Sequence, residues 1–164
     1  GNVTAAAEFN IFFDPEAAAI VFDCGVPVRT VPLDCTHHVI AEPAHVATLR
    51  AAGTPTSDLV AGLLEHYGRL GTASKVAGLG ALHDPCAVLS VVHPEMFGFV
   101  PRKVDIELDG RLTRGMTVVD TRPGVSPEEQ NAQFATSVDA GRVLRLILDA
   151  CVDPGHRPKA TRQR

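Results

Sequence analysis

The pattern of apolar and polar positions along the chain predicts helices that alternate with short buried strands. Two helices share one start signal, an Asp that can cap followed by a Pro, at Asp14-Pro15 and at Asp84-Pro85. The first continues through apolar residues to Phe22, and Gly25 can end it in a left-handed conformation. The β-branched segment 26–33 follows it and is typical of a buried strand.

The apolar stretch 7–13 precedes this helix, so the pattern predicts a strand, a helix and a strand of the kind that builds parallel sheets. Two further amphipathic helices are predicted. One covers residues 42–52 and is closed by Gly53, and the other covers residues 57–70 and is closed by Gly71.

Alternation changes in the last third of the chain. In residues 103–119, apolar and polar side chains alternate on both sides of Asp109-Gly110, which predicts a β-hairpin or ribbon. Residues 133–138 predict a last strand, and residues 140–151 a helix with one apolar face. We therefore expect an α/β fold, a Rossmann-like open and mostly parallel sheet with flanking helices plus a β-hairpin.

A chain of 164 residues is long enough for one domain with one core. We expect that domain to cover residues 1–152, followed by a basic, disordered tail at 153–164. The formal charge of -4 disfavours nucleic acid or an anionic membrane as a partner, because either would favour a basic surface.

The first residue is Gly1, and the two methionines, Met96 and Met116, are internal, so we expect further sequence upstream. The opening residues lack a basic leader, and no apolar run is long enough for a membrane helix. We expect a soluble, cytoplasmic protein that is not secreted.

The cysteines are widely spaced, without a CxxC pair, which favours reduced, buried thiols over a zinc site. They are Cys24, Cys35, Cys86 and Cys151.

Two clusters of polar residues can carry chemistry. Glu8 and Asn10 flank Phe9, and they offer acceptors and donors for hydroxyl groups. His83 precedes Asp84 at the mouth of a helix, where one can donate a proton and the other can bind backbone N–H groups or a cation. Taken alone, an Asp such as Asp84 is more often just an N-cap, and a His such as His83 is more often a loop residue.

Other reactive residues have simpler interpretations. Cys86 lies three residues after His83 and could form a thiolate nucleophile, but a packing cysteine needs no third, orienting group. His37 and His38 would point to opposite faces of a strand, which predicts one exposed and one structural histidine.

Three stretches together resemble the inosine-uridine preferring nucleoside hydrolase family, whose members cleave ribonucleosides to base and ribose. They are GNVTAAAEFNIFFDPEAAAIVF, VPVRTVPLDCTHHV and LHDPCAVL. The resemblance extends to about Cys151 and implies the carboxy-terminal half of that fold. It also implies a small-molecule nucleoside as substrate and hydrolysis of its N-glycosidic bond through an oxocarbenium-like ribosyl cation.

The resemblance carries roles to individual positions. It implies ribose binding by Asn2, Glu8, Phe9, Asn10 and Asp84, a catalytic role for His83 in the departure of the base, and calcium ligation by Asp84. Tyr67 falls near a region where the family places base contacts.

The family's DxDxxxDD cluster, which supplies most calcium ligands and activates water, is absent from the sequence. Calcium takes about 6–8 oxygen ligands, so Asp84 with waters alone cannot make a tight site. We expect the chain alone to be inactive and to form a homo-oligomer or associate with the missing half. The alternative is a non-catalytic remnant or interaction module of the same fold.

Overall fold

The structure, a computed structural model, describes residues 1–69, 78–153 and 155. Its helices are α1 Phe9–Phe13, α2 Pro15–Asp23, α3 Leu33–Thr36, α4 Pro43–Ala52, α5 Pro55–Arg69, α6 His83–Val92 and α7 Ala140–Val152. Its strands are β1 Val28–Thr30, β2 Ile40–Ala41, β3 Gly80–Ala81, β4 Phe97–Ile106, β5 Thr117–Asp120 and β6 Ala132–Val138. Short 3-10 turns cover Pro94–Met96 and Pro127–Glu129.

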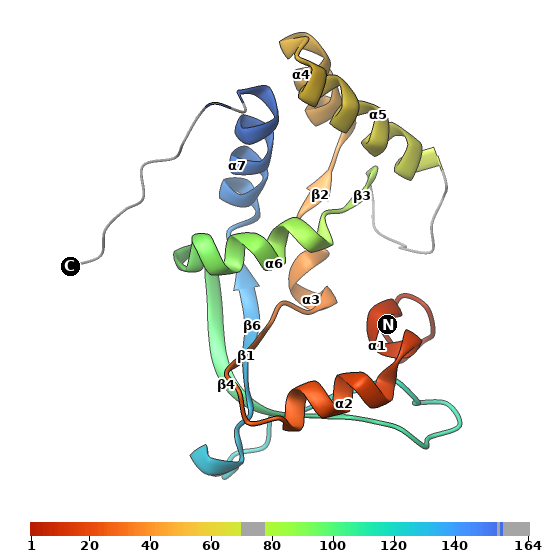
Figure 1. Cartoon of the computed structure of the whole chain (residues 1–164), viewed down its shortest axis with the longest axis vertical. Coiled ribbons are helices and arrows are strands. Elements are labelled where there is room, and N and C mark those ends of the chain that lie inside the picture. Colours follow the sequence, from red (N-terminus) through yellow and green to blue (C-terminus); the bar gives the residue numbers. More distant parts are fainter. Residues whose placement is uncertain (70–77, 154, 156–164) are drawn as a thin grey trace, which may run out of the picture.

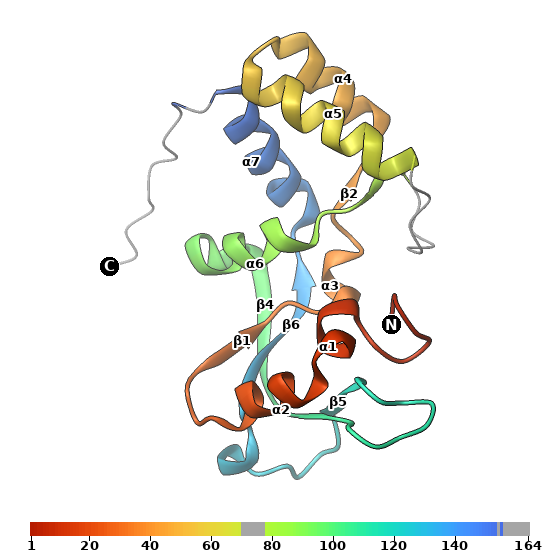
Figure 2. The ribbon, with the colours of Figure 1, turned by 45° about the vertical axis from the view of Figure 1, so that its right-hand side comes forward.

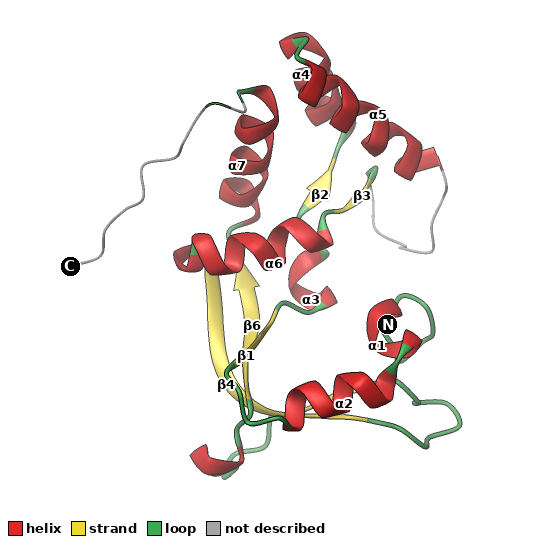
Figure 3. Ribbon diagram, in the orientation of Figure 1, coloured by secondary structure: helices red, strands yellow, loops and turns green. Residues whose placement is uncertain are grey.

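The strands form a mixed sheet of order β1-β6-β4-β5, shown in yellow in Figure 3, and a separate antiparallel pair of β2 and β3. β1 and β6 are parallel, with Val28 opposite Ala132. β4 runs antiparallel to both β6 and β5. The predicted α/β class with flanking helices is confirmed, but the pairing of described strands is mixed rather than mostly parallel, because the hairpin strand β4 occupies the middle of the sheet.

The helices fall into two groups around the sheet. Helices α4, α5 and α7 contact one another and gather at one end of the molecule (Figure 1). Helix α2 packs against β4, and α3 packs against β6 and α6. Figure 2 shows α1 beside α2, below the start of α6. This arrangement brings the first residues of the chain near α6, which lies in the middle of the sequence.

Several predicted elements are confirmed. Asp14 caps α2 by accepting a hydrogen bond from the Ala17 N–H at 2.9 Å, and α4 ends at Gly53 in the left-handed conformation. The ribbon of β4 and β5 is confirmed, although residues 107–116 connect its strands instead of a tight turn at Asp109-Gly110. Helix α5 is confirmed, and its predicted stop at Gly71 lies outside the described residues.

One predicted element is wrong, and two others exist with different bounds. Residues 7–13 contain helix α1 instead of a strand, because Glu8 caps its backbone N–H groups. The strand predicted at 26–33 is reduced to β1. Helix α6 begins at His83 with Leu82 as its N-cap, so Asp84 lies within the first turn and does not cap it.

The connection between β4 and β5 holds α1 and α2 in place. Arg114 in this connection forms an ion pair with Glu16 of α2 at 2.7 Å. Gly115 has a positive φ of 80°, and a Cβ there would lie 3.0 Å from the Phe12 Cα in α1. Only glycine combines this conformation with so close an approach, so Gly115 allows α1 to pack on the connection.

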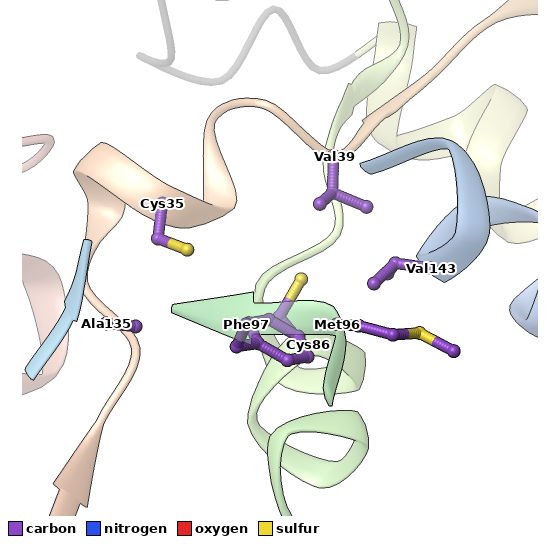
Figure 4. Close-up of a cluster of buried hydrophobic side chains, with 7 residues drawn as sticks. All are labelled: Cys35, Val39, Cys86, Met96, Phe97, Ala135 and Val143. Atoms are coloured by element: carbon purple, nitrogen blue, oxygen red, sulfur yellow. The ribbon is translucent and has the colours of Figure 1, made fainter. Parts of the chain in front are cut away.

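Buried side chains form three clusters. The cluster in Figure 4 joins α3, α6, β4, β6 and α7 and includes two cysteines with their sulfurs inside the core; its buried members are Cys35, Val39, Cys86, Met96, Phe97, Ala135 and Val143. A second cluster lies between α2 and the sheet, and a third joins α4, α5 and α7. The predicted apolar face of α7 is confirmed, since Leu144 and Ile147 pack on the first cluster and Leu148 on the third.

All four cysteines are free. Cys35 and Cys86 are buried as predicted, but Cys24 is exposed at the end of α2. No helix within the described ranges has the length and apolar character needed to cross a bilayer.

Candidate functional site

A cavity of about 230 Å³ lies between α1, α3, the first turn of α6 and the start of β5. Its polar lining comes from five segments that are distant in the sequence; these residues are Glu8, Asn10, Thr30, Thr36, His83, Asp84 and Thr117. Ile11, Phe22 and Phe134 add apolar walls. A small cavity with a few convergent polar groups on apolar walls is the usual form of a ligand site.

The structure brings four of the six predicted site residues together. Glu8 and Asn10 from α1 face the same cavity as His83 and Asp84 from α6. Asn2 and Phe9 do not line it. The Asn2 side-chain oxygen accepts a hydrogen bond from the Phe9 N–H at 2.9 Å, and the Phe9 ring, 55% exposed, lies against Phe13.

Glu8 is held by the helix that it caps. Its carboxylate accepts hydrogen bonds from the backbone N–H groups of Asn10 at 2.8 Å and Ile11 at 3.1 Å. The other carboxylate oxygen accepts the Asn10 side-chain amide at 3.3 Å. Both side chains are therefore oriented before any ligand arrives, which lowers the entropy cost of binding.

His83 is half-buried at the first position of α6. Its Nδ1 lies 2.7 Å from the Thr36 hydroxyl, and its ring meets the His37 ring edge-on at 5.7 Å between centroids. Burial lowers the pKa of His83 and His37 lowers it further, against the opposing influence of Asp84 and Glu8. The site therefore favours the neutral imidazole.

Asp84 is exposed in the first turn of α6. Within the described residues its carboxylate has no hydrogen-bond or ion-pair partner, so it is available to a ligand. However, no group of three or more His, Cys, Asp and Glu side chains gathers anywhere in the described part of the chain. Because calcium takes about 6–8 oxygens, these residues alone do not fit a calcium ion.

Cys86 does not fit the role of a nucleophile. Its side chain is buried outside the cavity lining, and its thiol donates a hydrogen bond to the Leu82 carbonyl at 3.0 Å. Burial raises the pKa of Cys86 to about 12. The thiolate that would attack a substrate is therefore scarce at neutral pH. This rules out a hydrolase that uses Cys86 as its nucleophile.

Sequence reasoning missed several polar residues at this site. Thr30, Thr36 and Thr117 line the cavity, and His37 contacts His83. His37 and His38 were expected in a strand, but they follow α3; His38 is exposed and His37 is half-buried, as expected for one exposed and one structural residue. Nothing in the sequence separated Thr36 from other threonines, because its importance comes from a contact with a residue 47 positions away.

A larger hollow of about 710 Å³ lies at the far end of the sheet, next to the loop before β6. Its charged lining residues include Asp23, Lys103 and Glu128, and none of the predicted site residues lines it. The smaller cavity is therefore the candidate site.

Comparison with known proteins identifies the family to which the chain is similar. A model of the family described as inosine-uridine preferring nucleoside hydrolase matches residues 1–145. The chain is 47% identical over 150 residues to the pyrimidine-specific ribonucleoside hydrolase RihA of Salmonella typhimurium, covering 91% of this chain and 48% of that protein. It is 39% identical over 150 residues to the inosine-uridine preferring nucleoside hydrolase of Crithidia fasciculata, covering 92% and 47%.

Solved structures have the same fold. The purine-preferring ribonucleoside hydrolase from Gardnerella vaginalis matches with a TM-score of 0.82 at 31% identity, over 93% of this chain and 48% of that chain. The plant nucleoside hydrolase PpNRh1 matches with a TM-score of 0.82 at 26% identity, over 94% and 50%. The chain therefore spans about half the length of the relatives that it matches.

Proposed function

The chain belongs to the inosine-uridine preferring nucleoside hydrolase family, and we propose that it contributes half of an active site that hydrolyses the N-glycosidic bond of ribonucleosides to free base and ribose. One observation carries the proposal. Glu8 and Asn10 share a cavity with His83 and Asp84, although about 75 residues separate the two pairs. Groups suited to sugar hydroxyls and a group suited to the base thus line one cavity, as one nucleoside would require.

In the proposed site the ribose lies against α1. Glu8 accepts hydrogen bonds from sugar hydroxyls, and the neighbouring Asn10 amide can both donate and accept. Asp84 faces the same space from α6 and contacts the sugar from the opposite wall. His83 assists departure of the base, because its ring lines the same cavity and its Nδ1 lies 2.7 Å from the buried Thr36 hydroxyl, which holds the ring in place.

We propose that Asp84 also supplies one carboxylate to a calcium ion. A bound calcium would activate the attacking water, but most of its ligands would have to come from outside this chain. The relatives are about twice as long as this chain, and we propose that the missing calcium ligands correspond to residues in the part of the relatives that this chain does not cover. The residues described here account for sugar binding and base departure, and they account for no step at the metal.

The partner that we propose is that second part of the fold. Apolar side chains remain exposed on α2 and, separately, on α6; they are Ile20, Val21, Val88, Val91 and Val92. Exposed apolar patches mark surfaces that bind another polypeptide. Self-association through the same surface is the competing outcome.

We also propose a cytoplasmic location. All four cysteines are free, and two of them, Cys35 and Cys86, lie in the same core cluster. Free thiols are typical of proteins that work in a reducing compartment.

A second candidate function is a non-catalytic interaction module. It is favoured by the exposed apolar side chains of α2 and α6, and by the finding that no group of three or more His, Cys, Asp and Glu side chains gathers in the described residues. Under this alternative the cavity remains, but no nucleoside is cleaved in any combination of chains.

Inosine and uridine hydrolysis, followed in the presence of calcium, separates the two functions. The chain is assayed alone and mixed with a polypeptide carrying the part of RihA that the chain does not cover. We expect turnover only in the mixture, and we expect a calcium chelator to abolish it. His83→Ala should also abolish turnover. His93→Ala should not, because His93 lies outside the cavity. Turnover by the chain alone would contradict the shared site, and a mixture that binds without turnover would favour the interaction module.

A further inference from the structure

Thr36 is one of the few buried polar residues in the chain, at 3% exposure. It is the last residue of α3, and its hydroxyl lies 2.7 Å from Nδ1 of His83. Both residues line the candidate cavity. Because the contact joins a buried hydroxyl to the proposed base-assisting residue, the direction of this hydrogen bond affects the chemistry of the site.

The surroundings of Thr36 decide which partner donates. His83 Nδ1 is the hydrogen-bond partner of the Thr36 side chain within the described residues. If Nδ1 carried the proton and donated it, the hydroxyl hydrogen of Thr36 would be buried without an acceptor, which is unfavourable. If the hydroxyl donates, both groups are satisfied and the ring proton resides on Nε2.

We infer that Thr36 is a positioning residue, which donates its hydroxyl proton to His83 Nδ1 and holds His83 in the Nε2–H tautomer, so that the cavity receives a neutral hydrogen-bond donor. The inference rests on the proposed function for its meaning. Nε2 is the ring nitrogen left for a ligand, and the groups that it can bind on a nucleobase are a ring nitrogen lone pair or a carbonyl oxygen.

The scaffold around this pair is well suited to fix a ring. Cys35, next to Thr36 on α3, and Cys86, three residues after His83 on α6, are packed in the same core cluster. The Leu82 N–H, at the residue before His83, donates to the Val39 carbonyl at 2.8 Å. The two segments are therefore joined on both sides of the Thr36 hydroxyl, and neither can move away from the other without breaking core contacts.

This assignment changes the role of His83. A neutral imidazole with its proton on Nε2 polarises the base through a hydrogen bond and need not deliver a full proton before the glycosidic bond breaks. The bond pair leaves with the base, and the hydrogen bond to Nε2–H stabilises the negative charge that develops there. The water that adds to the ribosyl cation loses one proton as its C–O bond forms, and the departed base anion takes up one proton, so the products are neutral base and ribose.

Nitrogen-15 NMR of histidine-labelled chain, in solution or under magic-angle spinning, tests the tautomer directly. His83→Gln identifies the His83 resonances. In the unsubstituted chain we expect a bare, hydrogen-bonded Nδ1 and a protonated Nε2. Thr36→Val keeps the side-chain shape and removes the hydroxyl, so the Nδ1 resonance should shift and the tautomers should mix. Thr36→Ser should restore the original shifts.

Thr48→Val is the matched control, because the Thr48 hydroxyl bonds a backbone carbonyl of α4 away from the cavity. It should leave the His83 shifts unchanged. A protonated Nδ1 in the unsubstituted chain, unchanged His83 shifts in Thr36→Val, or shifts in Thr36→Ser like those of Thr36→Val would each overturn the inference.

Turnover provides a separate readout in the mixture with the complementing polypeptide. Thr36→Val should lower kcat about three- to tenfold with little change in KM, the effect of weakening one neutral hydrogen bond. If the mixture never turns over but the NMR shifts respond as expected, the proposed function fails and the tautomer assignment stands. An unchanged kcat in Thr36→Val would show that the assignment has no part in catalysis and would overturn the proposed role.

Discussion

Glu8 has two roles: its side chain caps α1, and it lines the cavity where we propose that ribose binds. Two substitutions separate these roles. Its carboxylate accepts two backbone N–H groups of α1, from Asn10 at 2.8 Å and Ile11 at 3.1 Å. Glu8→Gln keeps an oxygen for those donors and removes the charge. Glu8→Ala removes both functions.

The structure sets the size of each effect. Loss of a capping side chain costs about 0.5–2 kcal/mol, so Glu8→Ala should lower the free energy of unfolding by about 1 kcal/mol and Glu8→Gln by less than half of that. Hydrogen bonds to charged groups exceed neutral ones by about 1 kcal/mol. Glu8→Gln should therefore weaken ribose binding about fivefold, while Glu8→Ala should weaken it more than tenfold.

Urea unfolding measures the first quantity, and calorimetric titration of ribose into the complemented protein measures the second. Glu42→Gln is the control, because Glu42 is the N-cap of α4 and does not line the cavity. It should leave ribose affinity unchanged. Equal losses of affinity in Glu8→Gln and Glu42→Gln, or unaltered affinity in Glu8→Ala, would refute the assignment of Glu8 to the sugar.

Three further predictions concern stability, thiol chemistry and association. Asn131 makes three hydrogen bonds of 2.7–3.1 Å to backbone atoms of α2 and β4, so Asn131→Ala should lower the free energy of unfolding by about 2–4 kcal/mol in urea titrations; a change under about 0.5 kcal/mol would contradict this. Burial raises the pKa of Cys86 from 9.0 to about 12, so the unfolded chain loses this proton first and stability should fall as pH rises from 9.0 toward about 12. At pH 8, mass spectrometry should find iodoacetamide on exposed Cys24 long before Cys86, and equal rates would contradict the core packing. Val91 is 68% exposed on α6, so Val91→Lys should reduce the mass of the associated protein measured by light scattering. Leu112→Lys, in the connection between β4 and β5, should leave that mass unchanged. A monomeric mass for the unsubstituted chain would refute association.

Local signals predicted the elements whose ends are set by nearest neighbours. The Asp14 cap and the left-handed Gly53 act within four residues, so α2 and the end of α4 could be predicted from the sequence. The same is true of the β4–β5 ribbon, because its alternation reflects one buried and one exposed face. Residues 7–13 were misassigned, because an apolar run of that length suits a strand and a short helix equally.

Sheet order and site geometry depend on contacts between distant residues. β4 enters between β6 and β5, and this pairing of segments some 35 residues apart made the sheet mixed. The motifs around Glu8 and His83 indicated a family and its chemistry, but their meeting in one cavity depends on α1 packing against the β4–β5 connection and on α3 packing against α6. Sequence patterns thus predict chemistry that a few neighbouring residues carry, whereas the Thr36 contact and the burial that lowers the pKa of His83 arise only when the whole core closes around them.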